Sequence, residues 1–234
     1  MFITHGYQRA QIQDVANALR LGKGTLYGYA QGKAALFAAA VRYADGIEAL
    51  PTPAQLPVAA PAAGEIAELV ASRLAGEVAD LELTRALSHP DRAITPDQVA
   101  GELAGMVADL YRRLSCHRVA IKLVDRCAPE LPDLAQVWFG TARTAQVGAM
   151  QEYLTRRHDT GTLTLPGPVD LVARTVVELC ALWAVHCHFD PAPTPPGVPP
   201  GASPFDDATV AATLAAFITR ATTPRPAARS ETPA

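Results

Sequence analysis

The chain has 234 residues, of which 49% are hydrophobic and 18% charged, and its formal net charge is −3. A chain of this length can bury a sizeable core in one large domain or in two smaller ones. It has no apolar run of the roughly 18 residues that a membrane span requires, and no basic stretch followed by an apolar core at its N-terminus, so neither a membrane protein nor a signal peptide is expected. The four cysteines form no CxxC pair, which indicates reduced thiols in a cytoplasmic protein.

The charge is unevenly distributed along the chain. Residues 1–45 contain five lysines and arginines but only two acidic residues, whereas the rest of the chain is acidic. A basic head on an acidic body is typical of a nucleic-acid-binding module joined to a domain with another task.

Two short helices joined by a tight bend are predicted close to the N-terminus. Apolar side chains from both helices are expected to pack together: Ile12, Val15, Ala16, Leu19, Leu21 and Leu26. The second helix and its surroundings carry groups that contact phosphates and base edges: Gly22, Lys23, Gly24, Thr25, Tyr27, Tyr29 and Lys33. In such a helix-turn-helix the second helix enters the major groove of DNA. The pattern therefore predicts a DNA-binding head over residues 1–46.

The remainder of the chain predicts further helices separated by proline and glycine. A proline-rich connection over residues 47–64 is followed by helical apolar spacing over 65–88, 96–115, 118–127, 132–157, 170–189 and 205–221. Thr95 is the expected N-cap of the helix that begins at Pro96. Residues 190–204 are too rich in proline for a helix and are expected to form an extended, mobile loop, and residues 222–234 a disordered tail. No alternating strand pattern of useful length occurs, so the predicted fold is all-α.

The stretch from Phe2 to Tyr43 resembles the DNA-binding domain of TetR-family bacterial transcriptional regulators. The matching residues are Phe2, Gly6-Tyr7, Ile12, Asp14-Val15-Ala16, Leu21, Lys23-Gly24-Thr25-Leu26-Tyr27, Tyr29, Lys33 and Leu36-Phe37. The resemblance implies that Gly22–Tyr29 is the recognition helix and that Thr25, Tyr27, Tyr29 and Lys33 contact the DNA backbone. Residues 128–154 have a weaker resemblance to the ligand-binding half of some regulators in this family.

The chain departs from the family pattern in several places. Leu19-Arg20 occupies the bend where the family has a small residue and glycine, so the turn must form without the left-handed freedom of glycine. Gly22 replaces a common serine, and Ala30 replaces a large aromatic residue. The chain begins at what would be the end of the family's first helix, so that helix is expected to be truncated. Either the true start lies upstream of Met1 or the head is marginally stable.

The helix over residues 170–189 is apolar nearly all the way round and must be covered on more than one side. The resemblance implies that this helix and the last one pair with those of a second subunit. The residues expected at this dimer interface are Val176, Cys180, Trp183, Ala184, Cys187, Val210, Leu214 and Phe217. A two-fold dimer would present two recognition helices to a palindromic operator.

A ligand cavity is expected among the helices of the body, residues 65–221, which would then be the ligand-binding and dimerisation domain. Large or polarizable side chains are its expected lining: Met106, Tyr111, Trp138, Phe139, Arg143 and Trp183. The expected ligand is small and largely apolar, and ordinary core packing is the alternative for each of these residues.

Three functional hypotheses follow. The first is a homodimeric regulator, usually a repressor, whose small-molecule effector changes the placement of the two heads on double-stranded DNA. The second is a dimeric small-molecule-binding protein whose truncated head does not bind DNA. The third is an enzyme, but no HExxH, GxSxG, GxGxxG or P-loop pattern occurs. The neighbours His186, Cys187 and His188 would point about 100° apart on a helix, so no catalytic residue, metal or cofactor is expected.

Overall fold

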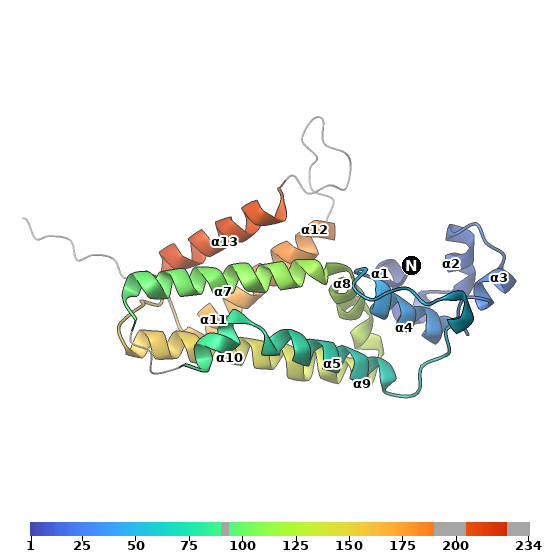
Figure 1. Cartoon of the computed structure of the whole chain (residues 1–234), viewed down its shortest axis with the longest axis horizontal. Coiled ribbons are helices and arrows are strands. Elements are labelled where there is room, and N and C mark those ends of the chain that lie inside the picture. The colour runs from blue at the N-terminus through green and yellow to red at the C-terminus, as the bar shows by residue number, and fades with distance from the viewer. Residues whose placement is uncertain (90–93, 190–204, 224–234) are drawn as a thin grey trace, which may run out of the picture.

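The computed structural model describes residues 1–89, 94–189 and 205–223, and they form an all-α fold as the sequence predicts. The first four helices form one end of an elongated molecule (Figure 1), and they are α1 (Phe2–Arg9), α2 (Ile12–Ala18), α3 (Lys23–Tyr27) and α4 (Lys33–Tyr43). The rest of the molecule consists of α5 (Glu65–Ala79), α6 (Glu82–Leu87), α7 (Pro96–Cys116), α8 (Arg118–Cys127), α9 (Pro132–Ala135), α10 (Arg143–Asp159), α11 (Val169–Ala181), α12 (Cys187–Phe189) and α13 (Asp207–Thr222). Short 3₁₀ turns lie at Pro53–Gln55 (η1) and Ala128–Glu130 (η2).

Two of the long helices contain a stretch of π-helix. Gln136–Ala142 (η3) joins α9 to α10, and Leu182–His186 (η4) joins α11 to α12. The predicted helix over 132–157 is confirmed, and it ends at Asp159, two residues before the left-handed Gly161. Wide turns of this kind are often found at functional sites, and the cavity described below lies beside both of them.

Thr95 caps α7 as predicted, since its side chain accepts the Gln98 N–H and the Gln98 side chain accepts the Thr95 N–H. The prediction of one helix over 65–88 is wrong, because Leu81 is extended and buried between α5 and α6. Tertiary contacts overrode the helical spacing there.

The predicted tail also begins too early. Thr222 belongs to the last turn of α13, and its carbonyl accepts the N–H of Thr164. The loop expected over 190–204 and the tail from residue 224 lie outside the described residues.

The buried side chains form two clusters. The larger lies among α6, α7, α10, α11 and α13. The smaller joins the head to the rest of the molecule, since Phe2, Phe37 and Val41 of the first four helices pack with Val70 of α5 and Leu123 of α8. The head therefore shares its core with the body rather than closing on itself.

The connection between α4 and α5 returns to the head before it reaches α5 (Figure 1). The N–H of Val58 donates to the carbonyl of Tyr29 at 2.8 Å, and the N–H of Gln31 donates to the carbonyl of Val58 at 2.9 Å. This segment is thereby hydrogen-bonded to the backbone immediately after α3.

The bend between α2 and α3 forms without glycine, as the sequence requires. Arg20 adopts a left-handed φ of 56°. The N–H of Leu21 donates to the carbonyl of Ala16, and the N–H of Arg20 to that of Asn17. These are the two hydrogen bonds of a Schellman motif, with arginine at the position that glycine usually occupies.

Replacing Arg20 by glycine is expected to raise the free energy of unfolding by about 1 kcal/mol, because a left-handed conformation costs a residue with a Cβ roughly 1–2 kcal/mol and glycine's greater unfolded-state entropy offsets part of the gain. Urea denaturation of the full chain measures the difference. Arg20→Ala is the control, since alanine keeps the Cβ and should gain nothing from this term. Equal stability of the glycine and alanine variants would contradict the argument.

Candidate functional site

The predicted recognition helix lies at the far end of the head (Figure 1). Gly22 precedes α3, and Leu26 is the buried residue that anchors the helix. The predicted contacts on and beside α3 are all exposed, namely Gly22, Lys23, Gly24, Thr25, Tyr27 and Tyr29. A lysine, a hydroxyl and two phenols are thus available on α3 and directly after it, which suits contacts to phosphates and base edges.

Lys33 is placed differently from the other predicted contacts. It is half-buried, its Nζ donates to the carbonyl of Gln8 at 3.1 Å, and it lies 4.8 Å from the centre of the Tyr7 ring. Its ammonium group therefore holds α1 against α4, in addition to any contact it makes with DNA.

Two of the apolar residues expected to pack between α2 and α3 are exposed. Leu19 caps the end of α2 and Leu21 follows the left-handed Arg20, so neither continues the inward helical register. The expectation that both are buried is wrong. Ala16 and Leu26 are the buried residues of this pair of helices.

A cavity of about 200 Å³ lies where the head meets the body. Its walls come from α4, α5, α7, α8, η3, α10, α11 and η4, and its apolar lining includes Val41, Val70, Leu74, Leu110, Ile121 and Val177. Val41 belongs to α4, so one wall of the cavity is part of the head. A mostly apolar hollow with a few polar groups has the character of a small-molecule site.

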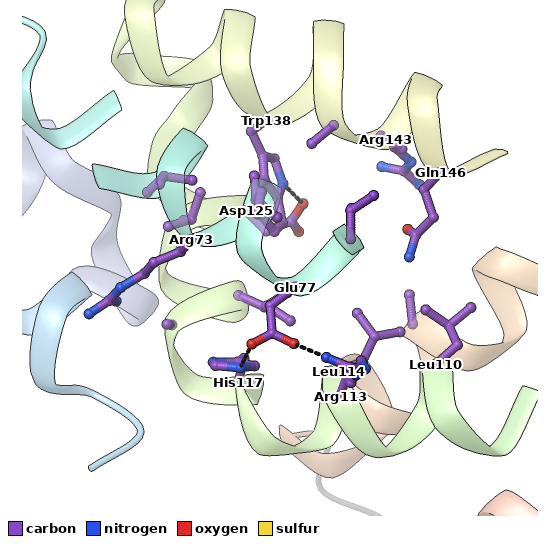
Figure 2. Close-up of a pocket in the computed structure, with 18 of the residues that line it drawn as sticks. Arg73, Glu77, Leu110, Arg113, Leu114, His117, Asp125, Trp138, Arg143 and Gln146 are labelled. Atoms are coloured by element: carbon purple, nitrogen blue, oxygen red, sulfur yellow. Dashed lines mark hydrogen bonds and ion pairs between the residues drawn. The ribbon is translucent and has the colours of Figure 1, made fainter. Parts of the chain in front are cut away.

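One side of the cavity carries a network of charged groups, which Figure 2 shows at the bottom of the view. Arg113 donates to Glu77 at 2.8 Å, and the Nε2 of His117 lies 3.1 Å from the same carboxylate. Burial opposes the charge of Glu77, but hydrogen bonds from Arg113 and the charge of His117 outweigh it, so the pKa of Glu77 is lowered. The network joins α5 to α7, because the Glu77 carboxylate of α5 is held by Arg113 of α7 and by His117.

Two polar links join the cavity walls to the last turn of α4 and to Asp45, which follows that helix. The guanidinium of Arg73 donates to the carbonyls of Val41 and Arg42, each at 2.8 Å. The carboxylate of Asp45 accepts the N–H groups of Val119 at 2.9 Å and Ala120 at 3.2 Å, at the start of α8. Arg73 and Ala120 both line the cavity. A displacement of the cavity walls would therefore be transmitted to α4, the helix that follows the recognition helix α3.

The structure places the residues expected around a ligand in three different environments. Trp138 and Arg143 line the cavity. Met106 and Tyr111 instead lie in the packed core, with the Tyr111 hydroxyl donating to Asp207 at 2.8 Å. Phe139 and Trp183 are at the surface, outside the cavity lining. The cavity side of α7 carries Leu110, Arg113 and Leu114. Tyr111 lies about 100° round the helix from Leu110, whereas Met106 lies on the same side about one turn earlier, where the core is packed.

Sequence reasoning missed the polar lining residues Glu77, Arg113, His117, Asp125 and Gln146. A signal was present for two of them, because Arg113 lies at helical spacing among the apolar residues of α7 and His117, directly after that helix, continues the same spacing. Nothing in the sequence connects them with the residues of α5 and α8.

The residues expected at a dimer interface are also divided. Five of them are buried in the chain's own core: Val176, Cys180, Ala184, Val210 and Leu214. Cys187 is half-buried, whereas Trp183 and Phe217 are exposed, the latter by 65%. Among the described residues, the helix over 169–189 thus keeps part of its apolar surface exposed, and Leu171, Leu182 and Phe189 add to that surface.

The thiols and histidines suggest no catalytic group. Burial raises the pKa of Cys180 to about 12 and that of Cys127 to about 11, so both remain neutral thiols. His186 is the acceptor for Lys122 at 3.2 Å, and His188 for Arg118 at 2.6 Å. Among the described residues no group of three metal-ligating side chains is gathered, and no described helix is long and apolar enough to cross a membrane.

The comparisons with known proteins agree with the geometry of the head. The family model described as "Bacterial regulatory proteins, tetR family" matches residues 1–40, which include α1 to α3 and most of α4. Searches of curated proteins and of solved structures find no match. The matched segment contains the exposed recognition surface described above, and the chain therefore carries an N-terminal DNA-binding head similar to that of the tetR family of bacterial regulatory proteins.

Proposed function

We propose that this DNA-binding regulator is a homodimeric, cytoplasmic repressor that a small molecule releases from its operator by binding in the cavity at the head–body junction. The observation that carries the proposal is the pair of links from the cavity walls to α4, through Arg73 and Asp45. A ligand that binds better when these walls are displaced would shift the heads to a second arrangement.

The proposal divides the chain into a head at residues 1–46, a connection at 47–64 and a ligand-binding and dimerisation domain at 65–221. The shared cluster of Phe37, Val41, Val70 and Leu123 supports a rigid junction between the first and last of these parts. A rigid junction is what transmission from the cavity to the recognition helix requires.

A dimer is supported by the apolar side chains left exposed on α11 to α13, which include Leu171, Leu182, Trp183 and Phe217. An exposed apolar surface over neighbouring helices favours burial against a second copy. Two copies related by a two-fold axis would place two α3 helices in successive major grooves of a palindromic operator. Sedimentation equilibrium of the intact chain tests this part of the proposal.

The decisive experiment measures fluorescence anisotropy of labelled DNA from upstream of the chain's own gene, with unrelated DNA as the control, over a salt series. Selective binding that weakens steeply with salt is expected. Lys23→Ala should weaken binding and reduce the salt slope by about 1, the loss of one phosphate contact. Arg85→Ala removes an exposed charge from α6 in the body and is the matched control.

Equal, weak binding to both DNAs would contradict the proposal. It would favour a dimeric small-molecule-binding protein whose head does not bind DNA. An unchanged affinity and salt slope in Lys23→Ala would remove α3 as the element that contacts DNA.

A further inference from the structure

The charges around the cavity are almost completely matched. Three arginines line it, and each already pairs with a carboxylate: Arg73 with Glu48, Arg113 with Glu77, and Arg143 with Glu178. An anionic ligand would therefore find no arginine whose charge is uncompensated.

Asp125 is the exception among the acidic residues of the lining. Within residues 1–89, 94–189 and 205–223 it forms no ion pair, and its side chain accepts one hydrogen bond, from the indole N–H of Trp138 at 3.2 Å. Figure 2 shows Asp125 and Trp138 together at the top of the cavity, away from the network of Glu77. The cavity thus contains one carboxylate whose charge is not matched by a cation.

The consequence appears when a ligand fills the cavity. An apolar ligand removes water from the Asp125 carboxylate, and a carboxylate that loses water without gaining a cation is costly. A ligand with its own positive charge removes that cost. The face of an indole also attracts an ammonium group, and Trp138 lies beside Asp125.

We propose that the cavity selects an apolar organic cation, an ammonium group on a hydrocarbon body, with Asp125 as the residue that determines this specificity. The ammonium group pairs with the Asp125 carboxylate oxygen that does not accept the Trp138 N–H, beside the Trp138 ring. The hydrocarbon body contacts the apolar walls formed by residues such as Leu110 and Val177. This inference rests on the proposed function, because it assigns a ligand class to the same cavity.

The test compares three probes with the same ten-carbon chain and different head groups: decylammonium, 1-decanol and decanoate. Binding to the full chain is measured by calorimetry and by the fluorescence of Trp138 in a Trp183→Phe variant, which leaves Trp138 as the one tryptophan. Decylammonium is expected to bind about tenfold or more tightly than decanol, as a charge-assisted hydrogen bond would give, and decanoate most weakly.

Two variants separate the specificity of Asp125 from its structural role. Asp125→Asn keeps an oxygen for the Trp138 N–H but removes the charge, so it should abolish the preference for decylammonium and leave the affinity for decanol unchanged. Asp133→Asn removes an exposed carboxylate on α9 and should leave all three affinities as they are. A preference that persists in Asp125→Asn, decanol binding as tightly as decylammonium, or binding of none of the probes overturns the inference.

Release of DNA is measured separately by adding each probe to the protein–DNA complex. Charge-selective binding that leaves the complex intact would support the inference and contradict the effector role of the cavity. Probe binding therefore tests the ligand class, and DNA release tests the effector role of the cavity.

Discussion

Replacing Phe37 by alanine is expected to lower the free energy of unfolding by about 3–5 kcal/mol, the usual cost of deleting a buried phenylalanine ring. Phe37 is fully buried on α4, with its ring centre 5.2 Å from that of Phe2 and 5.1 Å from that of Tyr7, both edge-on. The ring also belongs to the cluster that joins the head to α5 and α8. Its loss removes the ring that packs against both Phe2 and Tyr7 of α1.

Urea denaturation of the full chain measures the stability of Phe37→Ala, and anisotropy on operator DNA measures its effect on binding. Phe37→Leu should cost less, because it keeps most of the buried volume. Leu50→Ala is the control, since Leu50 is 73% exposed and such a change should cost less than about 0.5 kcal/mol. A cost for Phe37→Ala no larger than that of the control would show that this cluster does not stabilise the head.

Replacing Arg113 by methionine is the second change with a large expected effect, a loss of about 3 kcal/mol. Arg113 pairs with Glu77 and with the buried Asp109, and it donates to the carbonyl of Asp80. Burial lowers the pKa of Arg113, but Glu77 and Asp109 raise it by more, so the pKa lies above its ordinary value. Methionine keeps much of the side-chain length but leaves both carboxylates without this partner.

Arg112→Met is the matched control for Arg113→Met. Arg112 pairs with the same Asp109, but its side chain is 62% exposed, so its loss should cost no more than about 1 kcal/mol. Equal effects of the two substitutions would contradict a special role for the Arg113 network.

The pH dependence of stability gives a second measurement on the same network. Because the pKa of Glu77 is lowered in the folded chain, its contribution is complete above the ordinary value of 4.5 and is lost as the pH falls through the lowered pKa. Since a hydrogen bond from Arg113 is one cause of that lowering, Arg113→Met should make the chain less stable at neutral pH and flatten its loss of stability in acid. A denaturation series from pH 7 downward compares the two proteins.

The sequence by itself determined the elements that depend on local signals. Thr95 with Pro96 starts α7 as expected, because a capping box requires only residues three positions apart. The head was recognisable for a related reason. Within one short segment, buried residues that pack α2 against α3 are interspersed with exposed residues that point outward. The all-α class follows from helical spacing over most of the chain.

Local signals failed where a distant partner decides the conformation. The break at Leu81 between α5 and α6 depends on burial in a core built from other helices, and the side of α7 that faces a cavity depends on where α5, α8 and α10 lie. Met106 lies on the same side of α7 as Arg113, seven residues earlier, yet Met106 packs inside the core and Arg113 lines the cavity.

Only the tertiary structure could bring together the groups of the candidate cavity. Glu77 meets Arg113 from 36 positions away, and Asp45 meets the start of α8 from 74 positions away. Asp125 and Trp138 are 13 positions apart, on different helices. Sequence periodicity specifies which side of a helix is apolar, but the matching of charges across helices is decided by how those helices pack. The uncompensated charge of Asp125 is therefore visible only in the folded chain.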